Sequence, residues 1–413
     1  MERDWPYALF DVVGIELEFM IVDAVTLQVR GLAAEALAAV GGGFDEDAEL
    51  GPIAWCNELA LHVLEMKTNG PAPSLRGLAS RFADGVRQAN QILAPLNAVL
   101  LPGAMHPWMD PARDLNLWPH GYNDVYKAFD RIFDCRGHGW ANLQSMHINL
   151  PFRDDAEFGK LHAAIRMVLP LLPGLAASSP YADGRFTGFH DYRLEVYRHN
   201  ADRIPSVVGR VVPERVFTPD EYEARILGAI YRDMEPHDPE GILRHEWANA
   251  RGAIARFDRG AIEIRVIDLQ ECPLADLTVA ALAVGAVHAL TEERWCTGEA
   301  QREFSEESLG AVFDACVRDG DQARMEDAAY LRALGMSGEA VTAGAAWRHL
   351  SKVLQPPGGW GEFEAPMELL LDQGTLARRM LTRAGSEPTP AVLRELAGAM
   401  AACLQEGRLL EGR

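Results

Sequence analysis

Two glutamates inside an otherwise apolar segment constrain the fold of this chain most strongly. Residues 12–23 alternate in the manner of a strand, with Ile15 and Leu17 on one side and Glu16 and Glu18 on the other. Such a strand lies with one face against a hydrophobic core. Its other face carries two carboxylates, two residues apart, towards solvent or a polar cleft.

Three further segments predict strands with charged side chains on one face. They are residues 57–68 with Glu58 and Glu65, residues 141–150 with His147, and residues 261–268 with Glu263 and Arg265. Residues two apart lie on the same side of a strand, so Glu263 shares a face with Arg265. Glu58 and Glu65 are seven apart and would face opposite sides of a straight strand. Either a bulge intervenes or Glu58 lies before the strand.

Each of these patterns has a simpler explanation when it stands alone. A pair of charged residues on a strand is more often a solvated face or a surface ion pair, and a single histidine is more often structural. Four such segments together favour a site, because carboxylates gathered in one cleft repel each other and are costly to bury unpaired. Divalent cations offset that charge, and oxygen donors with one imidazole suit Mg²⁺ or Mn²⁺. The hypothesis requires the four strands to converge.

Long helical segments lie between and after the predicted strands. They are residues 74–93 with Ser74 as N-cap, 155–172, 218–234, 274–290, 305–334, 338–353 and 389–406. Strands separated by long helices, without a regular strand–helix–strand repeat, predict an α+β fold with a mixed or antiparallel sheet. We expect a catalytic domain over residues 1–297 and a helical C-terminal region over residues 298–413 packed on it.

The charge balance argues against nucleic-acid and membrane binding, and the cysteines indicate a reducing compartment. The chain has 60 acidic and 39 basic residues and a formal net charge of −21, whereas nucleic-acid and anionic-membrane binding need a basic surface. Residues 1–6 lack the start of a signal peptide, and the longest apolar stretch, about residues 277–290, is too short to span a bilayer. Six scattered cysteines without a CxxC pair predict reduced thiols in a cytoplasmic protein.

The sequence contains neither a GxxxxGK[ST] nor a GxGxxG motif, so a glycine-rich phosphate loop is not indicated. A nucleotide would then be held by metal ions and arginines. Arginines are frequent near the centre of the chain, including Arg193, Arg198, Arg203 and Arg265. Their planar guanidinium groups pair well with phosphate and carboxylate.

Seven short segments, in this order, resemble the carboxylate–amine ligase family related to type 2 glutamate–cysteine ligase. The segments are residues 14–18, 57–71, 103–107, 144–150, 177–180, 188–193 and 261–268. Together they span about residues 12–290, so the resemblance extends over the predicted catalytic domain. The resemblance implies the glutamine synthetase-like catalytic fold, a curved and largely antiparallel sheet with helices on its outer face and, here, a helical C-terminal portion.

The resemblance also implies a role for each charged residue of the strands. The metal nearer the substrate would be held by Glu18, Glu58 and Glu65, and the metal that bridges the ATP phosphates by Glu16, His147 and Glu263. Catalysis would depend on Glu263 and on two arginines, Arg193 and Arg265, that stabilise the transferring phosphoryl group. Arg198 and Arg203 would bind the acid substrate. His190 and Asp191 depart from the family pattern, which has a small polar residue before the Tyr-Arg pair.

The reaction implied is ATP-dependent joining of a glutamate-like carboxylate to cysteine or another amine through an acyl phosphate. The implied cofactors are ATP and Mg²⁺, with Mn²⁺ as an alternative, and the partners are small-molecule substrates and a second copy of the chain. Two other functions stay open. A guanidino-type phosphotransferase of the same broad fold would release ADP with a guanidine compound alone. A non-catalytic nucleotide or amino-acid binder would have no reason to keep all six acidic and histidine ligands.

Overall fold

An eight-stranded sheet forms the centre of the molecule in the computed structural model, which describes residues 4–41 and 47–412. The first three residues of the N-terminal segment considered above lie outside these ranges. The strands are β1 (Gly14–Asp23), β2 (Ala48–Leu50), β3 (Ile53–Asn57), β4 (Val63–Thr68), β5 (Ala98–Leu101), β6 (Ser145–Pro151), β9 (Ala253–Arg256) and β10 (Ala261–Asp268). Their order is β2-β3-β4-β1-β6-β10-β9, with β5 also paired to β1.

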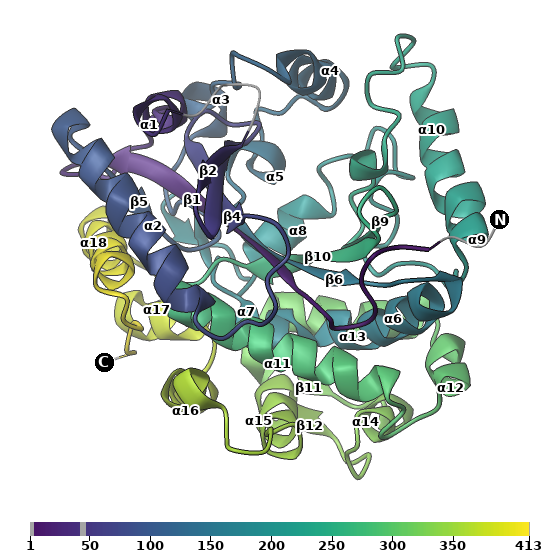
Figure 1. Cartoon of the computed structure of the whole chain (residues 1–413). Helices are drawn as coiled ribbons and strands as arrows, with labels where there is room; N and C mark the ends of the chain where they lie inside the picture. The colour runs from purple at the N-terminus through teal and green to yellow at the C-terminus, as the bar shows by residue number, and fades with distance from the viewer. Residues whose placement is uncertain (1–3, 42–46, 413) are drawn as a thin grey trace.

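Every pairing in this sheet is antiparallel. Figure 1 shows the strand direction turning between β4 and β10, as in a curved sheet. The predicted α+β class with a largely antiparallel sheet is therefore confirmed.

Three long helices cover the apolar face of the sheet: α2 (Leu78–Leu93), α6 (Asp155–Val168) and α11 (Pro273–Thr291) (Figure 1). Ile15 and Leu17 of β1 point into this layer and are fully buried. Burying one side chain of this size contributes about 1.5–3 kcal/mol, so the alternation of β1 fixes which face meets the core. The glutamates of β1 are thereby directed to the opposite face.

Helix α11 is apolar on all sides because the core surrounds it. Within the described ranges it is the one helix long and apolar enough to cross a membrane, but most of it is buried inside the protein. The apolar stretch at about residues 277–290 was expected to be too short to span a bilayer. The helix that contains it is longer than that stretch, with 19 residues, so the expected length was wrong.

Shorter helices lie around the sheet, some beside its open face and others packed against the core helices. They are α1 (Ala33–Ala39), α3 (Pro111–Asp114), α4 (Asn123–Phe133), α5 (His138–Ala141), α7 (Pro173–Ala176), α8 (Tyr192–Tyr197), α9 (Pro219–Tyr222) and α10 (Gly228–Met234). A π-helical turn, Glu223–Leu227, joins α9 to α10, so the predicted helix over 218–234 is continuous. In Figure 1, α4 and α10 stand on either side of the open face.

The C-terminal region is helical, as predicted. Its helices are α12 (Gly298–Glu303), α13 (Glu306–Asp319), α14 (Ala328–Ala333), α15 (Ala343–Val353), α16 (Glu364–Gln373), α17 (Leu376–Ala384) and α18 (Pro390–Glu406). Leu309, Phe313 and Trp347 from this region belong to the same hydrophobic core as the central sheet. The boundary at residue 297 stays a prediction.

Several predicted boundaries were wrong. The helix expected over 305–334 is interrupted, because Gly320 ends α13 with a positive φ and strand β11 (Arg324–Met325) follows. Strand β11 pairs with β12 (Val341–Thr342), and α14 lies between the two strands. The helix expected from residue 338 begins only after Thr342, whose side chain accepts a hydrogen bond from Ala345 N. A hairpin of β7 (Tyr181–Ala182) with β8 (Arg185–Phe186) was not predicted.

Two errors lie beside the candidate site. The strand expected over 57–68 begins only at Val63 with β4, because Asn57 ends the separate strand β3 and a loop follows it. The strand expected over 141–150 begins at Ser145, because Ala141 ends helix α5. Away from the site, a third expectation was also wrong: Ser74 caps no helix, and Gly77 precedes α2 instead.

Candidate active site

The charged strand residues lie directly opposite one another on neighbouring strands. Glu16 pairs with His147, Glu18 pairs with Glu65, and Glu263 pairs with Asn149 across the β4-β1-β6-β10 part of the sheet. Because paired residues share a face, these side chains all point away from the helical core. The convergence that the hypothesis requires is present.

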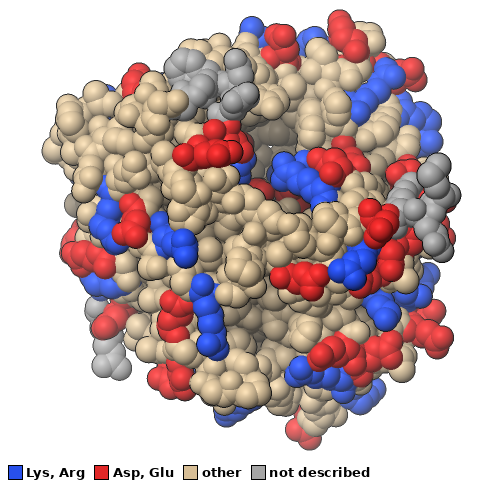
Figure 2. Space-filling view, in the orientation of Figure 1, with Lys and Arg blue, Asp and Glu red and all other residues tan. Residues whose placement is uncertain are grey.

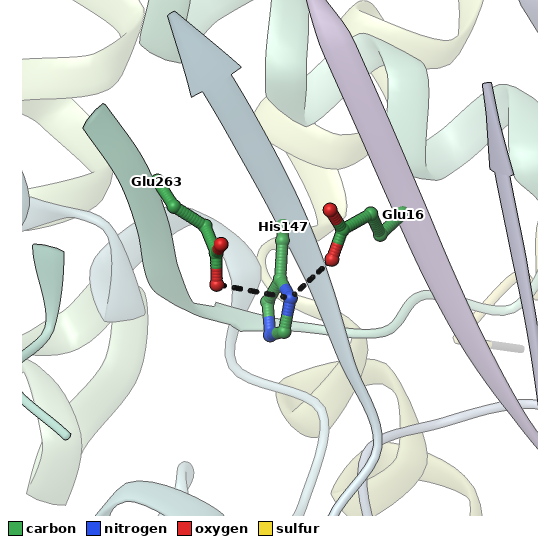
Figure 3. A group of neighbouring side chains, drawn as sticks. All are labelled: Glu16, His147 and Glu263. Carbon is green, nitrogen blue, oxygen red and sulfur yellow. Dashed lines mark hydrogen bonds and ion pairs between the residues drawn. The ribbon is translucent and has the colours of Figure 1, made fainter. Parts of the chain in front are cut away.

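Glu16, His147 and Glu263 form the first of two groups that could hold a metal ion (Figure 3). One ligand atom from each lies within 4.8 Å of the others. His147 Nδ1 is 2.9 Å from Glu16 Oε2 and 3.7 Å from Glu263 Oε1. Asn149 Nδ2 donates to the other Glu16 oxygen at 3.1 Å and so orients that carboxylate.

His147 keeps the Glu16 carboxylate of this first group ionised. Burial raises the pKa of Glu16, but the hydrogen bond and the charge of His147 outweigh burial and lower it to about 2. Burial and the charge of Arg265 lower the pKa of His147, but Glu16 and Glu18 outweigh them and raise it. Glu16 is thus ionised at neutral pH, in the form that binds a cation.

Glu18, Glu58 and Glu65 form the second group, again with ligand atoms within 4.8 Å of one another. Glu18 accepts hydrogen bonds from Ser145 N at 2.7 Å and Ser145 Oγ at 3.0 Å. Glu65 accepts one from the Cys56 thiol at 2.9 Å. Glu58 lies in the loop between β3 and β4, so of the two explanations left open, its position before the strand is correct.

This second group holds more negative charge than the protein around it neutralises. Burial and the charge of Glu18 raise the pKa of Glu58 to about 7. Burial, with the charges of Glu16 and Glu58, raises the pKa of Glu65 well above its usual range. Lys67 Nζ is 3.7 Å from Glu65 and also pairs with Asp47. A hard divalent cation among three such carboxylates would favour their ionised forms, so the donor set fits Mg²⁺ or Mn²⁺.

Two arginines adjoin the acidic groups. Arg265 pairs with Glu263 on the same face of β10, as predicted. Arg193 on α8 is fully buried, pairs with Asp268, and donates to the backbone oxygen of Arg265 at 3.4 Å. Asp191 explains the departure from the family pattern noted above, because its side chain accepts from Leu194 N and caps α8.

The acidic groups lie between two cavities. One, of about 250 Å³, is lined at one end by Glu18, Glu58, His147, Arg193 and Arg265. The other, of about 360 Å³, adjoins the opposite side of the first group, and the polar and charged residues in its lining include Glu16, Lys67, Asn149 and Arg259. Figure 2 shows a hollow in the upper half of this face, with acidic and basic side chains beside its opening.

Two residues of the predicted site are not brought to it. Arg198 is bound to Glu195 Oε2 at 3.2 Å and to Asp314 Oδ1 at 3.0 Å, and Arg203 donates to Ile132 O at 2.9 Å. Neither lines either of the two cavities.

Sequence reasoning missed the residues that hold the charged groups in place. Ser145 contacts both Glu18 and His147, with its Oγ 2.9 Å from His147 Nε2. The alternation of Ser145, His147 and Asn149 along one strand could have revealed it. Asp268 lies opposite Ser145 through a register shift between Ile264 and Ile267, which alternation cannot show.

Comparison with known proteins identifies the family of this chain. The model of glutamate–cysteine ligase family 2 matches residues 12–398. An uncharacterised protein of Archaeoglobus fulgidus is 35% identical over 283 residues, covering 68% of this chain and 75% of that protein. A Streptomyces coelicolor protein, provisionally named glutamate–cysteine ligase 2, is 25% identical over 398 residues, covering 95% of this chain and 98% of its own length.

Solved structures share the fold at lower sequence identity. A glutamate–cysteine ligase from Francisella tularensis, solved in complex with AMP, matches with a TM-score of 0.60 at 12% identity, covering 97% of this chain and 90% of that one. A bifunctional glutathione synthetase from Pasteurella multocida matches with a TM-score of 0.55 at 15% identity, covering 95% of this chain and 52% of that one, so this chain spans about half of it. With a family model that matches nearly the whole chain, this protein belongs to glutamate–cysteine ligase family 2, a family of ligase enzymes.

Proposed function

We propose that this protein is an ATP- and Mg²⁺-dependent ligase that joins a carboxylate to an amine through an acyl phosphate. One observation carries the proposal: the two ligand groups lie side by side on one face of the sheet, with Arg265 and Arg193 beside them. Membership of the ligase family supports the reaction class. The names of its relatives support a glutamate-like carboxylate and cysteine or another amine as the substrate classes.

The two cavities suit two kinds of ligand. The cavity beside Glu16, Lys67 and Arg259 would take the nucleotide, and the AMP complex of the Francisella tularensis structure supports nucleotide use. The cavity beside Glu18 and Glu58 would take the substrates. The two groups would hold Mg²⁺, or alternatively Mn²⁺, which would supply positive charge to the phosphate oxygens.

The proposed reaction has two steps: the γ-phosphoryl group is transferred to the carboxylate, and the amine then displaces phosphate. A carboxylate oxygen forms a bond to the γ-phosphorus as the bond to the β,γ-bridging oxygen breaks, which releases ADP. The amine nitrogen then attacks the acyl carbon, phosphate leaves, and the amine loses a proton. Arg265 and Arg193 would stabilise the charge of the phosphoryl group during the first step, and this effect is usually the largest in such sites.

Release of ADP by the purified protein tests the proposal. With ATP and Mg²⁺, release should require a carboxylate and an amine together. L-glutamate is the first carboxylate, offered with a panel of amines that includes L-cysteine. Glu263→Gln should lower kcat by about a hundredfold or more, because it weakens the first ligand group and the partner of Arg265.

Glu49→Gln is the matched control, since Glu49 is an exposed acid on β2 of the same sheet. It should turn over like the wild type. ADP release with a guanidine compound and no amine would instead identify a phosphotransferase. Tight ATP binding without turnover of any substrate pair would identify a binder.

Three further expectations belong to this proposal. The catalytic domain would end near residue 297, with residues 298–413 packed on it as a helical region. The protein would act in the cytoplasm, which agrees with its six free cysteines. It would form a homodimer.

A further inference from the structure

The substrate cavity has an aromatic wall facing its charged end. Five rings line it: Tyr126, Phe129, Trp140, Tyr197 and Trp247. They come from α4, α5, α8 and the short 3₁₀ helix Glu246–Ala248. Four separate segments therefore converge to build one apolar surface beside the ligand groups.

Direct contacts fix these rings in place. The Phe129 ring centroid lies 5.2 Å from that of Trp140 and 5.9 Å from that of Trp247. The Trp140 indole N–H donates to Asn200 O at 2.8 Å, and the Tyr126 hydroxyl accepts from Asn57 Nδ2 at 2.9 Å. These polar atoms are bound to the protein, so Trp140 and Tyr126 offer mainly their rings to a ligand.

Among the residues that the structure describes, every basic side chain in the lining of this cavity is already paired with a carboxylate of the protein. Among its described lining residues the basic side chains are His147, Arg193 and Arg265. His147 lies between Glu16 and Glu18, Arg193 pairs with Asp268, and Arg265 pairs with Glu263. Arg198 and Arg203, the predicted partners of an acid substrate, lie elsewhere. Glutamate and cysteine together would bring two α-carboxylates that do not react, and a buried charge without a partner is costly.

We infer that at least one substrate of this ligase carries an uncharged aromatic body, which packs against the aromatic wall at Phe129, Trp140 and Trp247. This inference rests on the proposed ligase function. The aromatic body belongs either to the amine or to the carboxylate, and its reacting group lies at the end of the cavity formed by Glu18, Glu58 and Arg265. Sites of this kind bind through apolar contact and take orientation from a few polar groups.

One experiment with two arms shows whether the amine or the carboxylate carries the aromatic ring. In the first arm L-glutamate is offered with 2-phenylethylamine or with L-cysteine, and ADP release is measured. In the second arm hydroxylamine replaces the amine, so that any acyl phosphate is captured as a hydroxamate, and 3-phenylpropionate is compared with L-glutamate. We expect the aromatic compound to have the higher kcat/KM in one arm, by about tenfold or more.

Variants of the aromatic wall test whether the preference for an aromatic substrate depends on this cavity. Trp247→Ala and Phe129→Ala should lower kcat/KM for the aromatic substrate by about tenfold or more, whereas Trp247→Phe and Phe129→Leu keep an apolar contact and should retain most of it. Phe186→Ala, which removes a half-buried ring outside the cavity, should have no effect. The inference is overturned if L-glutamate with L-cysteine is the best pair and Trp247→Ala leaves its kcat/KM unchanged.

A binding measurement separates failure of this inference from failure of the ligase proposal. If no pair releases ADP, the proposed function fails. Titration of 2-phenylethylamine and 3-phenylpropionate against tryptophan fluorescence still tests the wall, because Trp140 and Trp247 belong to it. A saturable change that Phe129→Ala abolishes supports an aromatic ligand, and the absence of any saturable change overturns the inference.

Discussion

Glu16 and His147 lie directly opposite each other on β1 and β6, with 2.9 Å between Glu16 Oε2 and His147 Nδ1. Two residues further along β1, Glu18 lies opposite Glu65 on β4. Strand β1 therefore contributes one carboxylate to each ligand group. The two groups are neighbours because residues two apart on a strand share a face.

The folded protein should be stabilised by Mg²⁺ or Mn²⁺, because the second group gathers three buried carboxylates with little compensating charge. A cation that binds only the folded chain stabilises it by about 2.7 kcal/mol at a hundred times its Kd. Calorimetry should therefore give a higher Tm in MgCl₂ than in EDTA. Glu18→Gln should remove most of this difference, while the exposed control Glu49→Gln should retain it.

Wild type and Glu18→Gln should also differ in EDTA. Burial and the charge of Glu65 raise the pKa of Glu18, so its ionised form is disfavoured in the metal-free fold. Glu18→Gln should accordingly have the higher Tm of the two in EDTA and the smaller response to Mg²⁺. Equal responses of the two proteins to Mg²⁺ would remove Glu18 from the ligand set.

Asp268 positions Arg193, so Asp268→Asn should lower kcat by about tenfold to a hundredfold. The carboxylate pairs with Arg193 Nε and also accepts from Ser178 N and Ser179 Oγ, each at 2.8 Å. Asparagine keeps an acceptor oxygen but loses the charge that fixes the guanidinium. Stopped-flow measurement of ADP formation should show the loss, with the Kd for ATP little changed.

Ser179→Ala is the comparison for this variant, because it removes one donor to Asp268 and the acceptor of Arg193 N but leaves the ion pair. It should reduce kcat much less. Near-ultraviolet circular dichroism checks that Asp268→Asn remains folded, since breaking a buried ion pair costs about 3–5 kcal/mol. A folded Asp268→Asn protein with unchanged kcat would exclude the positioning role.

The acidic face of the sheet was predictable because a strand repeats every two residues. Glu16 and Glu18 alternate with buried apolar neighbours, and the same rule placed Glu263 beside Arg265. The rule fails where the backbone departs from regular pairing. Asp268 reaches its position through a register shift in β10, and Glu58 occupies a loop where a strand was predicted.

The parts of the site that come from loops and short helices could not be predicted in this way. Arg198 follows α8 directly, but its partner Asp314 is more than a hundred residues away in α13. The sequence around Arg198 therefore could not show that its side chain pairs outside the cavity. Phe129, Trp140 and Trp247 each belong to a different element. No single segment of the sequence carries the pattern of the aromatic wall.

Acid should destabilise the fold through two buried histidines outside the site. Burial lowers the pKa of His62 and of His106 to about 4, whereas an unfolded histidine titrates near 6.5. Between these values the unfolded chain binds more protons, so the free energy of unfolding falls as pH drops from about 6.5 to about 4. Each histidine contributes a slope of up to about 1.4 kcal/mol per pH unit.

Urea unfolding midpoints at pH 7, 6 and 5 measure this effect. His62→Asn should show a smaller decrease over this range than the wild type, while His199→Asn, which removes an exposed histidine, should show the same decrease. Buried carboxylates with raised pKa values, such as Glu65, act in the opposite direction. The difference between wild type and variant therefore isolates His62, and equal slopes would show that it is not neutral in the fold.

A fully buried ion pair ties the C-terminal helices to the central sheet. Arg379 on α17 pairs with Glu271, which follows β10, and neither side chain is exposed to solvent. Arg379 also donates to Gly374 O at 3.2 Å, and Leu410 N donates to Glu271 at 3.1 Å. The same two residues thus connect β10, α17 and the chain end beyond α18.

Arg379→Met should lower the free energy of unfolding by about 3–5 kcal/mol, because it leaves the Glu271 carboxylate buried without its partner. Adding Glu271→Gln to Arg379→Met should recover part of that loss, since the uncompensated charge is then gone. Arg324→Met removes an ion pair with Glu326 in which both side chains are well exposed, and it should leave the urea midpoint unchanged.

The wild type should unfold in one transition, with the same midpoint by fluorescence and by circular dichroism. Residues on both sides of the predicted boundary at 297 share this ion pair and one hydrophobic core. Two separate transitions, with Arg379→Met affecting only the second, would instead mark residues 298–413 as an independent domain.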